Sequence, residues 1–105
     1  MAREQFQTLT EPMYYILLAL TQECCGVDIM EKVKMLSKGR VRVGPGTLYA
    51  MLGKFEENHI IKRTASEGRR KSYIITEEGE RMLEKEYERL QTMVRDGELW
   101  WEHRE

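Results

Sequence analysis

The sequence predicts a mainly α-helical fold with one small β-hairpin. Apolar residues recur every three or four positions over most of the 105-residue chain, which is the pattern of amphipathic helices. Residues 60–76 differ, because two strand-like runs flank a glycine-containing turn there. The composition is 41% hydrophobic and 33% charged, so a disordered chain is not expected. A chain of this length is expected to form one domain with a small core.

The first part of the chain predicts two helices. Thr10 is a good N-cap for a helix from about 11 to 22, over which the apolar residues follow helical spacing. Gly26 separates this helix from a second amphipathic helix at about 27 to 37. Residues 40–43 then alternate arginine with valine, which predicts a short extended segment.

The next part predicts a third helix followed by the hairpin. This helix starts in the turn at 44–47 and ends near Asn58. Its outward face carries glycine and alanine at helical spacing, so its backbone could come close to another surface. Strands at 60–66 and 71–76 flank the turn at 67–70 and complete the hairpin.

The last helix is long and amphipathic. Thr76 caps it, and Asp96–Gly97 is expected to end or loosen it. Residues 98–105 then form a tail in which the two tryptophans act as apolar anchors. A monomer of this size has few places to bury the apolar face of such a helix. We therefore expect that face to pack against a second copy of the chain.

This order of elements is that of a winged helix-turn-helix domain. The third helix of such a domain typically enters the major groove of DNA, and the hairpin lies along the backbone or minor groove. We expect a DNA-binding domain of this type over residues 1–76, and a dimerisation helix with its tail over 77–105. The residues expected to contact double-stranded DNA lie on the third helix and at the hairpin tip: Gly46, Thr47, Tyr49, Lys54, Arg69, Arg70 and Lys71.

Charge is distributed unevenly along the chain. Residues 38–76 have a net charge of +6, whereas residues 1–37 carry −2 and residues 77–105 carry −5. A basic segment between two acidic ones indicates a polyanionic partner for that segment. The alternative is a winged-helix module that binds proteins and not DNA. The three adjacent cations at 69–71 argue against it, because phosphates would relieve their mutual repulsion.

Enzymatic chemistry has little support. Neither His59 nor His103 belongs to a catalytic arrangement or to a set with metal-ligand spacing. Cys24 and Cys25 are adjacent, which disfavours a disulfide between them, and we expect packing residues in a reducing cytoplasm, with a redox role left open. The longest apolar run, at 13–20, is far shorter than the roughly 20 residues of a membrane span. We expect no catalytic site, no cofactor, no metal and no membrane association.

Four motifs make the chain resemble a known family. They are LTEPMYYILLAL at 9–20, GPGTLY at 44–49, GRRKSY at 68–73 and TEEG at 76–79. In this order and spacing they resemble the PadR family of bacterial transcriptional regulators, in its short-tailed branch, over about residues 8–95. The resemblance implies a cytoplasmic, homodimeric winged-helix repressor that binds inverted-repeat operators.

The resemblance also assigns roles along the chain. Residues 46–49 would start the recognition helix, residues 68–71 would form the wing, and the helix from Glu77 would pair with the first helix of the partner. Some members of the family respond to phenolic acids, drugs or other stresses, and many have no known effector. A small aromatic effector is therefore a partner to be tested.

Two positions depart from the family pattern. Gly53 stands where the family usually has the first of two basic residues, so DNA affinity is expected to depend more on the wing. Leu90 stands where the multidrug-sensing branch has a tryptophan that stacks planar drugs at the dimer centre. The residues expected to form the dimer interface and effector pocket are Tyr14, Tyr15, Tyr87, Leu90 and Val94.

Overall fold

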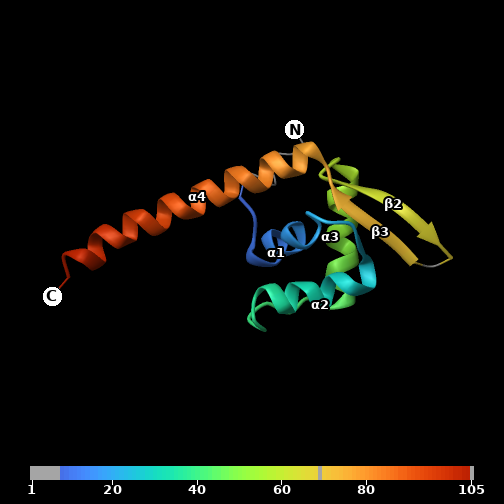
Figure 1. Ribbon diagram of the computed structural model, residues 1–105, viewed down its shortest axis with the longest axis horizontal. Helices are drawn as coiled ribbons and strands as arrows, with labels where there is room; N and C mark the ends of the chain where they lie inside the picture. The colour runs from blue at the N-terminus through green and yellow to red at the C-terminus, as the bar shows by residue number, and fades with distance from the viewer. Residues whose placement is uncertain (1–7, 69, 105) are drawn as a thin grey trace.

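The chain folds as a winged helix domain from which one long helix extends (Figure 1). The computed structural model describes residues 8–68 and 70–104. Its extents are 59 × 33 × 21 Å, and the longest of these follows the last helix. The elements are α1 (Glu11–Ala19), β1 (Cys24–Cys25), α2 (Gly26–Leu36), α3 (Pro45–Glu57), β2 (Ile61–Glu67), β3 (Arg70–Ile75) and α4 (Glu77–Glu102).

The three strands form one antiparallel sheet in the order β1-β3-β2. The predicted hairpin is confirmed, with Ile61 opposite Ile75 at its base and an irregularity in β2 at Thr64. The Thr64 hydroxyl donates a hydrogen bond to a carboxylate oxygen of Glu23, which joins the hairpin to the turn before β1. The sheet is therefore fastened at its base to the segment that leads into α2.

β1 was not predicted from the sequence, and the extended segment predicted at residues 40–43 is not a strand. β1 has two residues, Cys24 and Cys25, so it shows no alternation that a sequence pattern could reveal. Residues 40–43 alternate because Val41 and Val43 are buried while the intervening side chain is exposed, and no strand pairs with them. Alternation in that segment reflects anchoring of a loop and not a sheet.

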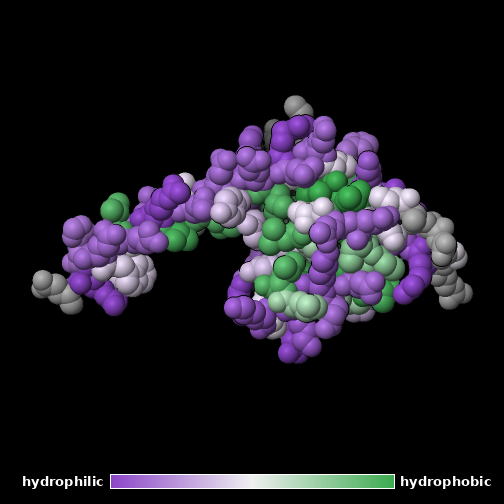
Figure 2. All heavy atoms as spheres, viewed as in Figure 1, coloured by the Kyte–Doolittle hydropathy of each residue, from purple (hydrophilic) through white to green (hydrophobic). Residues whose placement is uncertain are grey.

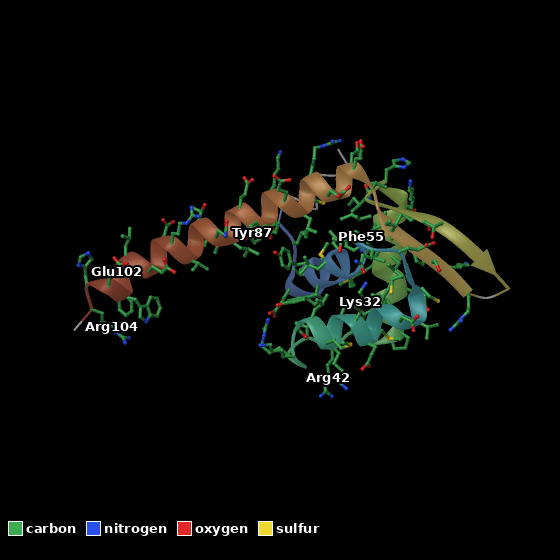
Figure 3. The ribbon with its side chains drawn as sticks, viewed as in Figure 1. Lys32, Arg42, Phe55, Tyr87, Glu102 and Arg104 are labelled. Carbon is green, nitrogen blue, oxygen red and sulfur yellow. The ribbon has the colours of Figure 1, made fainter. Side chains whose placement is uncertain are left out.

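The core lies between the first three helices and the base of the sheet. Its fully buried side chains come from every predicted apolar stripe of the domain, and Phe55 of α3 lies at its centre (Figure 3). The largest of them are Phe55, Ile16, Leu17, Leu20, Ile29, Leu48, Leu52, Ile60, Ile61 and Val33. Burial of these side chains is the main term that stabilises the domain.

Side-chain caps fix where α1 and α4 begin. Thr10 Oγ1 accepts the Met13 N–H at 3.3 Å, and Thr76 Oγ1 accepts the Gly79 N–H at 3.0 Å. α1 ends at Ala19, three residues before the predicted end at 22, because the chain must turn there to reach β1.

The first turns of α4 are fastened to the domain. Gly79 is required there, because a Cβ at this position would lie 2.2 Å from the Ile60 carbonyl oxygen. Two turns further on, the buried Glu86 carboxylate accepts the Leu9 N–H at 2.9 Å and two hydrogen bonds from Arg89 at 2.7 Å. These contacts set the direction in which α4 leaves the domain.

The prediction that α4 ends or loosens at Asp96–Gly97 is wrong. The helix continues to Glu102, although a glycine in a helix costs roughly 1 kcal/mol relative to alanine. The Trp101 ring lies 3.6 Å from the point where a Cβ of Gly97 would be, and Trp100 stacks edge-on against Trp101. Both tryptophans are more than half exposed, so they do not anchor a tail within the single chain.

No helix in the part of the chain that the structure describes is both long and apolar enough to cross a membrane.

Candidate nucleic-acid interface

The outward face of α3 is formed by small residues. Gly46, Ala50 and Gly53 are exposed, while Leu48 and Leu52 on the opposite face are buried. A Cβ added at Gly46 or Gly53 would meet no atom within 4 Å. The α3 backbone can therefore approach another surface closely along this face.

The start of α3 suits an anionic partner. Its N-cap is Gly44, which offers no side chain to the N–H groups of the first turn, and Pro45 occupies the first turn. The helix dipole adds partial positive charge at this end. Thr47 is exposed one turn in, so its hydroxyl is available to donate a hydrogen bond to a phosphate or a base edge.

Tyr49 lies where α3 meets the start of α2. Its side chain is 46% exposed. A Cβ at Gly26, the first residue of α2, would lie 3.0 Å from the Tyr49 hydroxyl, so the glycine leaves room for the phenol ring. From the sequence Gly26 was expected only to separate two helices, because no local pattern reveals its packing against Tyr49.

The structure brings Tyr49 of α3 together with Arg70 and Lys71 of β3. They surround a hollow of about 150 Å³, whose other lining residues are Cys25, Gly26, Val27 and Tyr73. Predicted contacts from two separate elements therefore share one surface. Arg69, a further predicted contact, lies outside the described residues.

The basic side chains of the hairpin differ in whether they form an ion pair within the domain. Arg63 of β2 forms an ion pair with Glu56 at 3.1 Å, and its guanidinium lies 5.9 Å from the Tyr73 ring centre. Arg70 and Lys71 are exposed, and neither forms an ion pair with any carboxylate whose side chain the structure describes. Their charge therefore remains available to a partner.

Lys54 extends the candidate surface along α3. It is exposed one turn beyond Ala50, next to Gly53. The Asn58 side chain donates a hydrogen bond to the Lys54 carbonyl oxygen at 2.8 Å, which satisfies a carbonyl of the last turn. The α3–β3 surface, as we call it, consists of Gly46, Thr47, Tyr49, Lys54, Arg70 and Lys71.

A second surface lies on the distal half of α4, the part beyond Glu86. Apolar side chains continue there along the side of the helix that faces the domain (Figure 2). Positions spaced alternately by four and three residues form one stripe, as in helices that pair in a coiled coil. The members of this stripe are Tyr87, Leu90, Val94, Gly97 and Trp101.

A groove of about 340 Å³ opens between this stripe and α1. Tyr14 of α1 faces Tyr87, Leu90 and Val94 of α4 across it. Burial raises the pKa of the Tyr14 hydroxyl, and the neighbouring Tyr87 adds to the shift. Four of the five residues expected in the dimer and effector pocket therefore line one groove.

Tyr15, the fifth of those residues, is not part of the groove lining. Its hydroxyl accepts a hydrogen bond from Arg40 at 3.0 Å. Its ring also packs edge-on against Tyr14, with the ring centres 5.9 Å apart. Tyr15 is thus next to the groove through its contact with Tyr14 but does not line it.

Neither a metal site nor a reactive thiol is evident in the described part of the chain. No three or more histidine, cysteine, aspartate or glutamate side chains there are grouped so as to hold a metal ion. Cys24 is a buried free thiol whose pKa burial raises, which disfavours the reactive thiolate. Cys25 is also free and lies partly exposed at the edge of the sheet.

Comparison with known proteins identifies the family. The model of the transcriptional regulator PadR-like family matches residues 16–85, which include the end of α1, all of α2, α3 and the hairpin, and the first turns of α4. The chain belongs to the PadR-like family. Its members are DNA-binding transcriptional regulators and not enzymes. A search of the curated proteins finds no match to the chain.

Solved structures similar to this PadR-like chain share its fold. A transcriptional regulator from Clostridium thermocellum is 23% identical, with a TM-score of 0.67 over 78% of this chain and 83% of that one. A PadR family transcription regulator from Clostridium difficile is 22% identical, with a TM-score of 0.66 over 84% and 97%. RosR of H. salinarum is 24% identical, with a TM-score of 0.59 over 87% and 94%. At these identities the likeness shows the fold alone.

Proposed function

We propose that this protein is a homodimeric transcriptional repressor that acts in the cytoplasm and binds inverted-repeat DNA. The observation that carries the proposal is the α3–β3 surface, where Tyr49 and two available cations border one hollow beside a helix face of small residues. Membership of the PadR-like family supports the same function. Residues 1–76 would bind DNA, and residues 77–105 would pair two copies.

In this proposal α3 enters the major groove. Thr47 and Tyr49 approach the base edges, and the small residues beside them allow the helix to lie deep in the groove. Arg70 and Lys71 of the hairpin bind phosphates, which adds affinity that falls with salt. Lys54 adds a further phosphate contact on α3.

The distal half of α4 is proposed to pair two copies of the chain. The exposed fractions of Tyr87, Met93, Val94, Trp100 and Trp101 lie between 50% and 61%, which is unusual for large apolar side chains along one helix. A second α4 with the same stripe, together with the partner's α1, would cover them. Two-fold pairing explains why the expected operator is an inverted repeat.

The groove between α1 and α4 is the proposed effector site. Its volume of about 340 Å³ is near the lower limit of small-molecule pockets. Tyr14 and Tyr87 offer aromatic faces to a small planar ligand. A ligand in this groove would alter how the two α4 helices pair, and through them the spacing of the two α3 helices on DNA.

The test is fluorescence anisotropy of the purified protein on a duplex taken from upstream of its own gene. A scrambled duplex of equal length serves as the control, and both are titrated at three salt concentrations. We expect tighter binding to the upstream duplex and a steep loss of affinity with salt. Absence of binding at low salt would contradict the repressor proposal and would favour a protein-binding module.

A further inference from the structure

The loop between α2 and α3 is held rigidly by one buried side chain. Ser37 is 4% exposed, and its hydroxyl oxygen accepts the Val41 N–H at 2.9 Å. The same hydroxyl lies 3.3 Å from the Val41 carbonyl oxygen, to which it can donate. Val41 and Val43 are themselves buried in the core. Two anchored valines therefore fix the backbone of the residue between them.

This anchoring gives two arginines of the loop opposite environments. Arg40 donates hydrogen bonds to Glu11 at 2.5 Å and to the Tyr15 hydroxyl at 3.0 Å, so its guanidinium is bound to α1. The hydrogen bond that Arg40 donates to Glu11 raises the pKa of Arg40. Arg42 is exposed, and it forms no hydrogen bond or ion pair with the residues that the structure describes.

The position of Arg42 relates it to α3. It lies two residues before Gly44, the N-cap of α3, and projects from the side of the domain opposite α4 (Figure 3). α3 also begins on that side of the domain (Figure 1). A cation at this place is next to the helix end that would meet DNA first.

We infer that Arg42 binds a DNA phosphate next to the start of α3 and thereby positions this helix along the groove. The inference rests on the proposed DNA-binding function. Because Val41 and Val43 already hold the loop backbone, only the arginine side chain has to be ordered on binding. Arg40, two residues away and of equal charge, takes no part, because its guanidinium is bound to Glu11 and Tyr15.

The test compares Arg42→Gln with Arg40→Gln by anisotropy on the upstream and scrambled duplexes. One phosphate contact contributes about 0.9 to the slope of log affinity against log salt, so a dimer should lose about 1.8 when Arg42 is replaced. Affinity should fall on both duplexes, since a phosphate contact carries no sequence information. Arg40→Gln should keep the wild-type slope, and Arg42→Lys should restore most of it.

The outcomes separate this inference from the function on which it rests. Arg42→Gln with the wild-type slope on a protein that binds DNA would overturn the role of Arg42 and leave the repressor proposal intact. Equal slope losses in Arg40→Gln and Arg42→Gln would also overturn it, because the effect would then be one of net charge. A wild-type protein that binds neither duplex would overturn both proposals together. Circular dichroism of each variant checks that the fold is retained.

Discussion

The α3–β3 surface and the distal half of α4 expose opposite kinds of side chain. The first has small residues, a half-exposed tyrosine and cations without described carboxylate partners. The second has large apolar side chains at coiled-coil spacing, within a segment whose net charge is −5. Within residues 8–68 and 70–104, nothing else in the chain covers either surface.

The difference shows how one small protein can bind two different partners through surfaces of different chemistry. A basic surface attracts a polyanion from a distance, and the attraction weakens with salt. An apolar stripe buries area against a matching helix and responds little to salt. We therefore interpret the first surface as the proposed DNA site and the second as the proposed pairing site. If this interpretation is correct, each surface can be disrupted without loss of the other.

The largest expected effect is a loss of stability at Gly79, where α4 packs on the winged helix domain. Gly79→Ala would place a methyl group 2.2 Å from the Ile60 carbonyl oxygen, so α4 would have to shift on the domain. We expect a loss of about 3 kcal/mol in the free energy of unfolding, measured with urea. Gly53→Ala is the control: its Cβ would meet open space, and it should gain about 0.5–1 kcal/mol. Equal stabilities of the two variants would contradict the packing described for Gly79.

Disruption of the pairing surface should leave the domain folded. Val94→Asp puts a carboxylate in the apolar stripe and should weaken self-association more than about a hundredfold. Light scattering after size exclusion should give the mass of one chain for this variant. Thr92→Asp, which adds the same charge elsewhere on the helix, should keep the mass of two chains. A dimeric Val94→Asp would mean that α4 pairs through another face.

Glu86 marks the point where α4 leaves the domain. Hydrogen bonds from Arg89, with that from Leu9, hold the pKa of its carboxyl below the ordinary value. A lowered native pKa stabilises the fold above the unfolded-state pKa, and this stability is lost as the pH falls through the native pKa. Glu86→Gln should therefore cost about 2 kcal/mol near pH 7 and progressively less toward pH 3.

Urea unfolding at several pH values measures the difference between Glu86→Gln and the wild type. Glu88→Gln, at an exposed position of the same helix, serves as the control and should change stability little at any pH. A cost of Glu86→Gln that stays constant with pH would contradict the ionised hydrogen-bonded state of Glu86.

Removal of the aromatic group from the DNA surface should reduce sequence discrimination. Tyr49→Ala is expected to cost roughly tenfold in affinity on the upstream duplex and less on the scrambled one. Tyr49→Phe keeps the ring over Gly26 and tests the hydroxyl alone. Equal losses on both duplexes would mean that Tyr49 positions the helix and does not read bases.

The smallest expected effect is the loss of one cation from the hairpin. Arg70→Ala should weaken binding alike on both duplexes and lower the salt slope by about 0.9 per chain. Arg63→Ala is a matched control, because that arginine is already bound to Glu56. If the salt slope changed for Arg63→Ala but not for Arg70→Ala, Arg63 and not Arg70 would be the arginine that binds DNA.

The sequence predicted the elements that have strong periodicity. The stripe of α3 and the strands at Ile61 and Ile75 were found because their burial repeats along the chain. β1 was missed because two residues carry no period, and its pairing with β3 depends on the tertiary fold. The end of α4 was predicted too early because glycine has a low helix propensity. The sequence does not show that the Trp101 ring packs over Gly97 in the continuing helix.

The candidate site was predictable as a set of residue types but not as an arrangement. The cations and the tyrosine were visible in the sequence. The room that Gly26 leaves for Tyr49 and the different environments of Arg40 and Arg42 depend on contacts between distant segments. A buried acid such as Glu86 was missed for the same reason, since its partner Leu9 is 77 residues away.

The most direct test of the account is native mass spectrometry of three proteins, each free and mixed with the upstream duplex. We expect two wild-type chains on one duplex, a Tyr49→Ala dimer that binds the duplex weakly, and a Val94→Asp protein that is a monomer when free. A Tyr49→Ala protein that no longer dimerises, or a Val94→Asp protein that is still a dimer in the absence of DNA, would contradict the separation of the two surfaces.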